Sequence, residues 1–223
     1  MRNYILLALL GIFLLSSCSN IKVLATKNVE EREGIKDKNI LVITRTVIQE
    51  NRIAFEDEIT SELRKMGLNA VASHTRFPEI LPNQKVAEEN RGKIRETIDK
   101  AGFNGVVMCV LQDKQELSRT VGEGDYYASV NYGYIDWPTY YGWGFYSYYY
   151  HPLSYSTEDI YVEGSEDTIT ARLYIVDTIG FNLDLPEDEQ FIGLIRAQIE
   201  NPESVSTTAR SYARAVAKTI KKS

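Results

Sequence analysis

The sequence predicts a single α/β domain, with an α+β arrangement as the alternative, built on a mixed sheet of five or six strands with three helices. Three observations predict this class. Short β-branched runs alternate with helical patterns between residues 39 and 112, which is typical of β-α-β units. Residues 168–176 alternate apolar and polar side chains, as half-buried antiparallel strands do. The C-terminal residues, from 204 on, have an amphipathic helical period.

The first strand and the first helix have the clearest signals. The run NILVITRT, residues 39–46, is rich in β-branched residues and has the length of a buried strand. Apolar residues then recur at helical spacing from Phe55 to Met66, and Gly67 stands where helices commonly end. We therefore expect a strand followed by a helix.

The next part of the chain completes the β-α-β-α-β order. A short strand is expected at 69–73, a helix at about 85–101 and an apolar strand at 105–112. Gly92 weakens the helix by up to about 1 kcal/mol relative to alanine, so its N-terminal half is expected to fray or bend. Residues 113–122 are expected to extend the strand as an exposed ribbon.

The C-terminal part predicts a hairpin, one more strand and a closing helix. The hairpin consists of residues 160–163 and 168–176, and the next strand of residues 191–200. Ser204 is a good N-cap for the helix. The expected buried stripe of this helix consists of Val205, Ala209, Tyr212, Val216 and Ile220.

Residues 1–17 have the features of a signal peptide. Arg2 precedes an apolar run of twelve residues, which covers only about 18 Å as a helix. The run ends in Leu-Ser-Ser-Cys, which resembles the lipobox of bacterial lipoproteins. The resemblance implies cleavage before Cys18 and attachment of acyl chains such as palmitate to that residue. The mature chain is then anchored to a membrane without spanning it.

Residues 18–38 are polar and mixed in charge, and we expect a lipidated tether before a domain at 39–223. The alternative for residues 21–25, IKVLA, is an edge strand of the sheet. Ser19 follows the cysteine, which by resemblance to enteric sorting rules implies the outer membrane, with the domain facing the periplasm.

The layout of the chain as a whole resembles a family of uncharacterised bacterial envelope lipoproteins. The resemblance rests on the lipobox, the NILVITRT and GFNGVVMCVL strands, a Tyr/Gly/Trp-rich insertion and the closing strand and helix. The element order is more remotely similar to the α/β domains of the curli-secretion lipoprotein and of the Tol-system periplasmic protein. These resemblances imply a fold and an envelope location, and they transfer no catalytic residue.

Motifs for catalysis or metal binding are absent from the sequence. The two histidines, His74 and His151, are 77 residues apart, and no HxH, HxxxH, CxxC or GxSxG pattern occurs. Cys109 lies in an apolar run and is expected to be a buried, unreactive thiol. We therefore predict a non-enzymatic protein with no catalytic residue, metal or cofactor.

The charge of the chain argues against nucleic-acid binding. The formal net charge is −6, and residues 120–171 contain eight acids and no lysine or arginine. Aromatic platforms for single strands need a basic groove that follows the phosphates. We therefore expect no nucleic-acid partner.

An aromatic insertion, residues 122–155, is the most unusual feature. Eleven of the 21 residues from 132 to 152 are Tyr, Trp or Phe, and interspersed Gly and Pro favour a loop or ribbon over a helix. Tyr and Trp are frequent in binding hot spots, and a large exposed cluster on a monomer is unusual. We therefore favour contact with an envelope protein, or self-association, through residues 126–155. The expected contact residues are Tyr134, Trp137, Tyr140, Tyr141, Trp143, Phe145, Tyr148, Tyr149 and Tyr150.

Other interpretations of the insertion stay open. It is also compatible with a flap packed on the domain, a membrane-interface element, a stacking platform for cell-wall glycans, or an unordered segment. A hydrolase of envelope material is the competing class of protein, and it would use carboxylates such as Asp125, Asp136 or Asp159 near the insertion.

Overall fold

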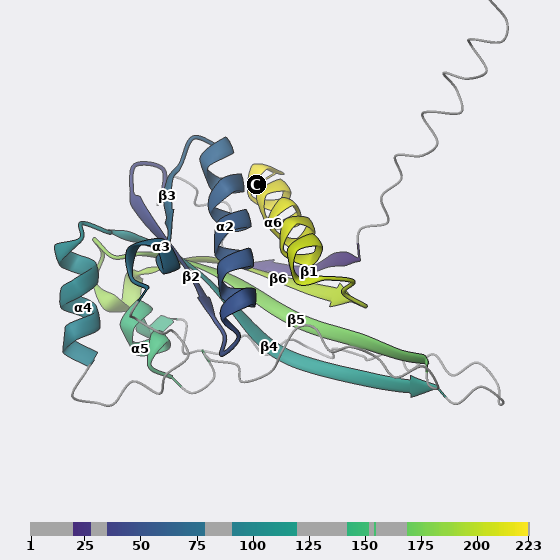
Figure 1. The fold of residues 1–223 in the computed structure, drawn as a ribbon. Coiled ribbons are helices and arrows are strands. Elements are labelled where there is room, and N and C mark those ends of the chain that lie inside the picture. Colours follow the sequence, from purple (N-terminus) through teal and green to yellow (C-terminus); the bar gives the residue numbers. More distant parts are fainter. Residues whose placement is uncertain are drawn as a thin grey trace, which may run out of the picture.

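The computed structural model describes residues 20–27, 35–78, 91–119, 142–151, 154 and 169–222. These residues form one six-stranded mixed sheet with helices on both faces (Figure 1). The strand order is β1-β6-β5-β4-β2-β3. The α/β class and the mixed sheet of the sequence-based prediction are confirmed.

The first half of the domain builds the parallel part of the sheet. Strand β2 (Asn39–Arg45) pairs in parallel with β3 (Asn69–Ala72) on one side and with β4 (Gly105–Arg119) on the other. Helix α2 (Gln49–Lys65) connects β2 to β3, and α4 (Arg91–Lys100) precedes β4. All five elements were predicted, and β4 does continue past residue 112 as a ribbon.

The antiparallel part consists of β5 (Ile169–Asn182), β6 (Phe191–Glu200) and β1 (Ile21–Lys27). Strand β5 is longer than the predicted 168–176 because it pairs with β4 at fourteen positions and also borders β6. The predicted hairpin partner at 160–163 lies outside the described residues.

Strand β1 corrects the prediction of a tether over residues 18–38. Ile21 and Val23 are partly buried against the hydrophobic core, and β1 forms an edge of the sheet beside β6. Asn20 is also held, because its carbonyl accepts the Glu200 N–H at 2.8 Å. The sheet therefore begins three residues after Cys18, and the domain is not limited to residues 39–223.

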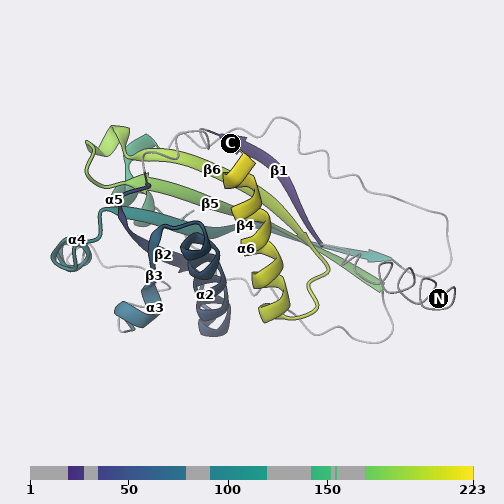
Figure 2. The same cartoon turned by 90° about the horizontal axis from the view of Figure 1, so that it is seen from above.

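Helices cover both faces of the sheet. Helices α2 and α6 (Val205–Lys222) lie side by side on one face (Figure 2). The ring centroids of Phe55 and Tyr212, one from each helix, are 5.5 Å apart. Ser204 caps α6, since its Oγ accepts the Thr207 N–H at 3.3 Å. The predicted stripe of α6 is buried along its whole length.

Two short helices were not predicted, α3 (Ser73–Arg76) and α5 (Phe145–Tyr149). Helix α5 and α4 contribute to the core of the second face. In the part of the chain that the structure describes, none of the helices has the length and apolar character needed to cross a membrane.

Helix α5 also corrects the prediction for the aromatic insertion. Phe145 and Tyr148 have no exposed surface, and Tyr149 is 2% exposed. Phe145 packs on Phe181 of β5 with ring centroids 5.7 Å apart. The expectation of a loop or ribbon with these three side chains in contact with a partner is therefore wrong, and the packed-flap alternative describes this stretch. Packing of these rings against the core outweighs the preference of the nearby Gly and Pro residues for turns.

Candidate functional site

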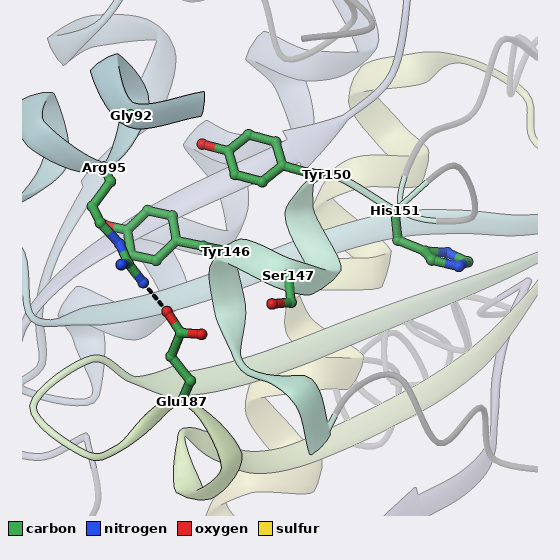
Figure 3. Close-up of a pocket in the computed structure, with 7 residues that line it drawn as sticks. All are labelled: Gly92, Arg95, Tyr146, Ser147, Tyr150, His151 and Glu187. Carbon is green, nitrogen blue, oxygen red and sulfur yellow. Dashed lines mark hydrogen bonds and ion pairs between the residues drawn. The ribbon is translucent and has the colours of Figure 1, made fainter. Parts of the chain in front are cut away.

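An open groove lies between α4, α5 and the 3₁₀ turn η6 (Glu187–Glu189), which belongs to the β5–β6 connection (Figure 3). Its volume is about 520 Å³, within the range of small-ligand sites. The lining combines rings, hydroxyls and charges from segments far apart in the sequence. The lining residues are Gly92, Arg95, Tyr146, Ser147, Tyr150, His151 and Glu187.

Arg95 of α4 joins the walls of the groove. Its guanidinium forms an ion pair with Glu187 and lies over the ring of Tyr146, with 4.4 Å between Cζ and the ring centroid (Figure 3). The Arg95 and Glu187 side chains are 48% and 49% exposed, so a ligand can reach both charges. The arrangement presents a cation, a carboxylate and an aromatic face within one site.

Tyr146 is held by α4 through its hydroxyl. The hydroxyl donates to Asp99 Oδ1 at 3.1 Å. Burial, together with the negative charge of Asp99, raises the pKa of Tyr146 well above its ordinary value. Tyr146 is therefore a neutral hydrogen-bond donor at ordinary pH, and its ring is fixed as one wall of the groove.

Gly144 sets the close approach of α5 to the β5–β6 connection. Its φ is +87°, and a Cβ at this position would lie 2.5 Å from the carbonyl oxygen of Glu187. The next residue, Phe145, donates its N–H to Gln190 Oε1 at 3.0 Å. Only glycine fits this backbone conformation and this space without strain.

Two of the expected contact residues remain accessible beside the groove. Trp143 is 53% exposed, and its ring meets the groove residue His151 edge-on at 6.2 Å. Tyr150 lines the groove and packs edge-on against Tyr149 at 5.4 Å. The other expected contact residues outside α5 lie beyond the described part of the chain, and they are Tyr134, Trp137, Tyr140 and Tyr141.

A second polar cluster lies at the carboxyl ends of β2 and β3, where α/β sheets commonly bind ligands. At its centre is the fully buried Glu56 of α2. Glu56 Oε1 accepts the Thr44 N–H at 3.0 Å, Arg52 Nε at 3.2 Å and Ser73 Oγ at 2.7 Å. Glu56 Oε2 accepts the His74 N–H at 2.7 Å and lies 2.9 Å from His74 Nδ1.

This saturation indicates a structural role for the Glu56 cluster, because five protein groups occupy the carboxylate and tie β2, α2 and α3 together. No sequence pattern pointed to the Glu56 cluster. The residues that meet there come from three separate segments of the chain.

Cys109 is buried in the sheet, as predicted. Burial raises the pKa of its thiol to about 12 from an ordinary value of 9.0. A thiol with such a pKa is almost fully protonated at neutral pH and is a poor nucleophile. The structure therefore supports the unreactive thiol expected from the sequence.

The acidic groups provide no metal site within the described residues, because no group of three or more His, Cys, Asp or Glu side chains there is arranged so that it could hold a metal ion. The groove is lined by one carboxylate of the described chain, Glu187. Asp125, Asp136 and Asp159, the carboxylates considered for a hydrolase, lie outside the described residues.

The fold and the groove define an α/β sandwich domain with an open, mixed aromatic and charged site at one end of its sheet. Comparison with protein-family models gives no match for the chain, and comparison with curated proteins gives none either. The resemblance to envelope lipoproteins therefore stays a prediction from sequence layout.

Proposed function

We propose that the chain is a lipid-anchored protein of the bacterial cell envelope that binds a partner protein in the groove between α4, α5 and η6, without catalysing a reaction. Acyl chains on Cys18 hold it on the outer membrane, with the domain in the periplasm. The membrane and one envelope protein, or a second copy of the chain, are its partners.

The observation that carries the proposal is the position of the groove relative to Cys18. Strand β6 runs from Phe191, next to the η6 turn, to Glu200, which is hydrogen-bonded to Asn20. Its ten residues span about 33 Å. A domain anchored through Cys18 with its strands upright therefore presents the groove away from the bilayer, where a periplasmic partner has access.

The chemistry of the groove favours a polypeptide ligand. Tyr146 and Tyr150 offer ring surface, and Trp143 adds an exposed indole beside them. Arg95 and Glu187 offer one charge of each sign. Tyr, Trp and Arg are enriched in protein interfaces, where rings fill pockets and charges set orientation. A peptide segment can match this lining, because it has apolar side chains for the rings, charges for Arg95 and Glu187, and backbone amides for hydrogen bonds.

A cell-wall glycan is the second candidate ligand. Sugar sites combine flat rings with polar groups that bind hydroxyls, and the aromatic insertion alone is poor in such groups. The fold brings Arg95, Ser147 and Glu187 beside the rings, and these side chains provide polar groups that could bind sugar hydroxyls. The groove gives less support to a hydrolase, because hydrolysis of glycans ordinarily needs two carboxyl groups. Glu187 is the one carboxylate among the described lining residues, and it is paired with Arg95.

Site-specific photo-crosslinking in living cells tests the proposal. A photoreactive phenylalanine analogue replaces Trp143, and the matched control carries it at Ile53, which is 38% exposed on α2. We expect a discrete adduct with another protein at position 143 and none at 53. The adduct should weaken when Arg95→Ala or Tyr150→Ala is added.

The outcomes separate the two candidate ligands. Loss of the adduct when soluble peptidoglycan fragments are added would favour the glycan, and equal labelling at 143 and 53 would contradict a binding role for this groove. Point changes are required, because deletion of residues 126–155 would remove the buried rings of Phe145, Tyr148 and Tyr149 from the core.

A further inference from the structure

A row of positive side chains covers the solvent-facing side of helix α6. Four of them recur at every fourth residue, which places them on successive turns, and a fifth lies beside the last. All five are exposed, and α6 contains no Asp or Glu. At 1.5 Å per residue the row is about 18 Å long. Its members are Arg210, Arg214, Lys218, Lys221 and Lys222.

Most of this positive row is not neutralised within the domain. Arg210 Nε pairs with Glu58 Oε1 of α2 at 3.1 Å. Among the described residues, no carboxylate forms an ion pair with the other four members. Like charges on successive turns destabilise a helix, so the row carries a cost in the isolated domain. A negatively charged partner would remove that cost.

The same chain carries a complementary surface. The β5–β6 connection, residues 183–190, has four carboxylates and no Lys or Arg. Two of these carboxylates have ion-pair partners in the domain. The other two, Asp188 and Glu189, are exposed and have no ion-pair partner within the described part of the chain. Leu185 of the connection is 39% exposed and offers apolar surface on which the methylene stems of lysines can pack.

One copy of the chain holds these two surfaces apart. The β5–β6 connection contacts α4 through the ion pair of Glu187 with Arg95, and it lies against α5 at Gly144. Helix α6 packs on the opposite face of the sheet, beside α2. Figures 1 and 2 both show α6 apart from α4 and α5. The positive row of one copy therefore finds a matching acidic connection on a second copy.

We propose that the positive row of α6 binds the β5–β6 connection of a second copy of the chain. The three lysines of the row pair with Asp188 and Glu189, and their stems pack on Leu185. Several charges acting together contribute more than one exposed pair does. The contact joins two different surfaces, so each pair of copies keeps one free surface of each kind and can extend into a row.

The η6 turn of this connection is also one wall of the groove, so the inference names a second copy as the partner there and rests on the proposed function. Cross-linking with a carbodiimide tests it, because this reagent condenses a lysine amine with a carboxylate into an amide. Isotope-labelled and unlabelled full chains are mixed, so that a mixed product identifies two copies. We expect a covalent dimer in which a peptide with residues 218–222 is joined to one with residues 184–189.

Exchange of the charges separates contact from misfolding. Lys218→Glu together with Lys221→Glu should lose the dimer, and so should Asp188→Lys together with Glu189→Lys. The four changes combined should restore it, because the two surfaces are then complementary again with the signs reversed. Failure of the combined protein to form the dimer would overturn the inference.

The matched control is Lys22→Glu with Lys100→Glu, which changes the net charge equally at exposed positions outside α6 and should keep the dimer. Absence of a mixed dimer would overturn the inference, and so would cross-links from 218–222 to carboxylates outside 184–189. Photo-crosslinking at Trp143 judges the groove separately. An adduct there with a different protein, and no mixed dimer, would keep the proposed function and remove the second copy as its partner.

Discussion

Arg52 and Glu56 lie one turn apart on α2 and form an ion pair that is sealed from water, with 3.2 Å between Arg52 Nε and Glu56 Oε1 and exposures of 1% and 0%. Loss of one member of such a pair leaves a buried charge without compensation. We expect Glu56→Gln to lower the free energy of unfolding by about 3 kcal/mol. Urea unfolding followed by circular dichroism measures it.

The matched control for this pair is Asp57→Asn, the next residue on α2, whose side chain is 57% exposed. Exposed ion pairs contribute little, so the loss should stay below about 1 kcal/mol. Equal losses for the two variants would show that the Glu56 cluster does not hold the carboxyl ends of β2 and β3 together.

The buried rings of α5 give a second prediction. Tyr149→Ala should destabilise the domain by about 3 kcal/mol, because it removes a buried ring and the stacking partner of Arg45, which lies 4.0 Å from the ring centroid. Trp143→Ala, at an exposed position of the same segment, should cost less than about 1 kcal/mol. The reverse order in thermal unfolding would contradict the packing of α5.

Gly144 gives a third prediction. Gly144→Ala should lower the free energy of unfolding by about 1 to 3 kcal/mol, because the residue has a φ of +87° and the new Cβ would meet the Glu187 carbonyl oxygen. Gly142→Ala is the control, since a Cβ there meets nothing within 4 Å. Similar denaturation midpoints for the two variants would show that α5 is free to move away from η6.

The pH dependence of stability follows from the buried thiol. Burial raises the pKa of Cys109 from 9.0 to about 12 in the folded chain. Between these values the unfolded chain has lost the proton and the folded chain keeps it, so the free energy of unfolding falls as pH rises. Burial likewise raises the pKa of Tyr212, which steepens the fall at higher pH.

We expect Cys109→Ala to lose stability at all pH values, through the cavity, but to show a shallower decline above pH 9. Urea titrations from pH 7 to pH 11 measure both effects. Parallel declines for the two proteins would contradict a protonated, buried thiol.

The sequence predicted those elements whose signals are local. Helix α6 has its apolar stripe and Ser204 within one segment, and β6 was placed at residues 191–200, as observed. Strand β1 is short and only partly buried, so its pattern fits a tether as well as an edge strand. Its assignment depended on β6, which is far away in the sequence.

The site was less predictable because its contacts are long-range. Arg95 and Glu187 are 92 residues apart, and no spacing rule connects them. The rings of α5 appeared suited to partner contact because the sequence does not show that Phe181 and Arg45 surround them. Gly144 was one of several glycines in the insertion, and only the fold distinguishes it by its positive φ.

Mass spectrometry of the N-terminal peptide, prepared from membranes of the native organism, tests the central proposal most directly. We expect a chain that begins at Cys18 and carries a thioether-linked diacylglycerol, with the protein in the outer-membrane fraction. A free thiol at Cys18, or a mature chain that begins at another residue, would contradict the lipid anchor and the membrane orientation inferred from it.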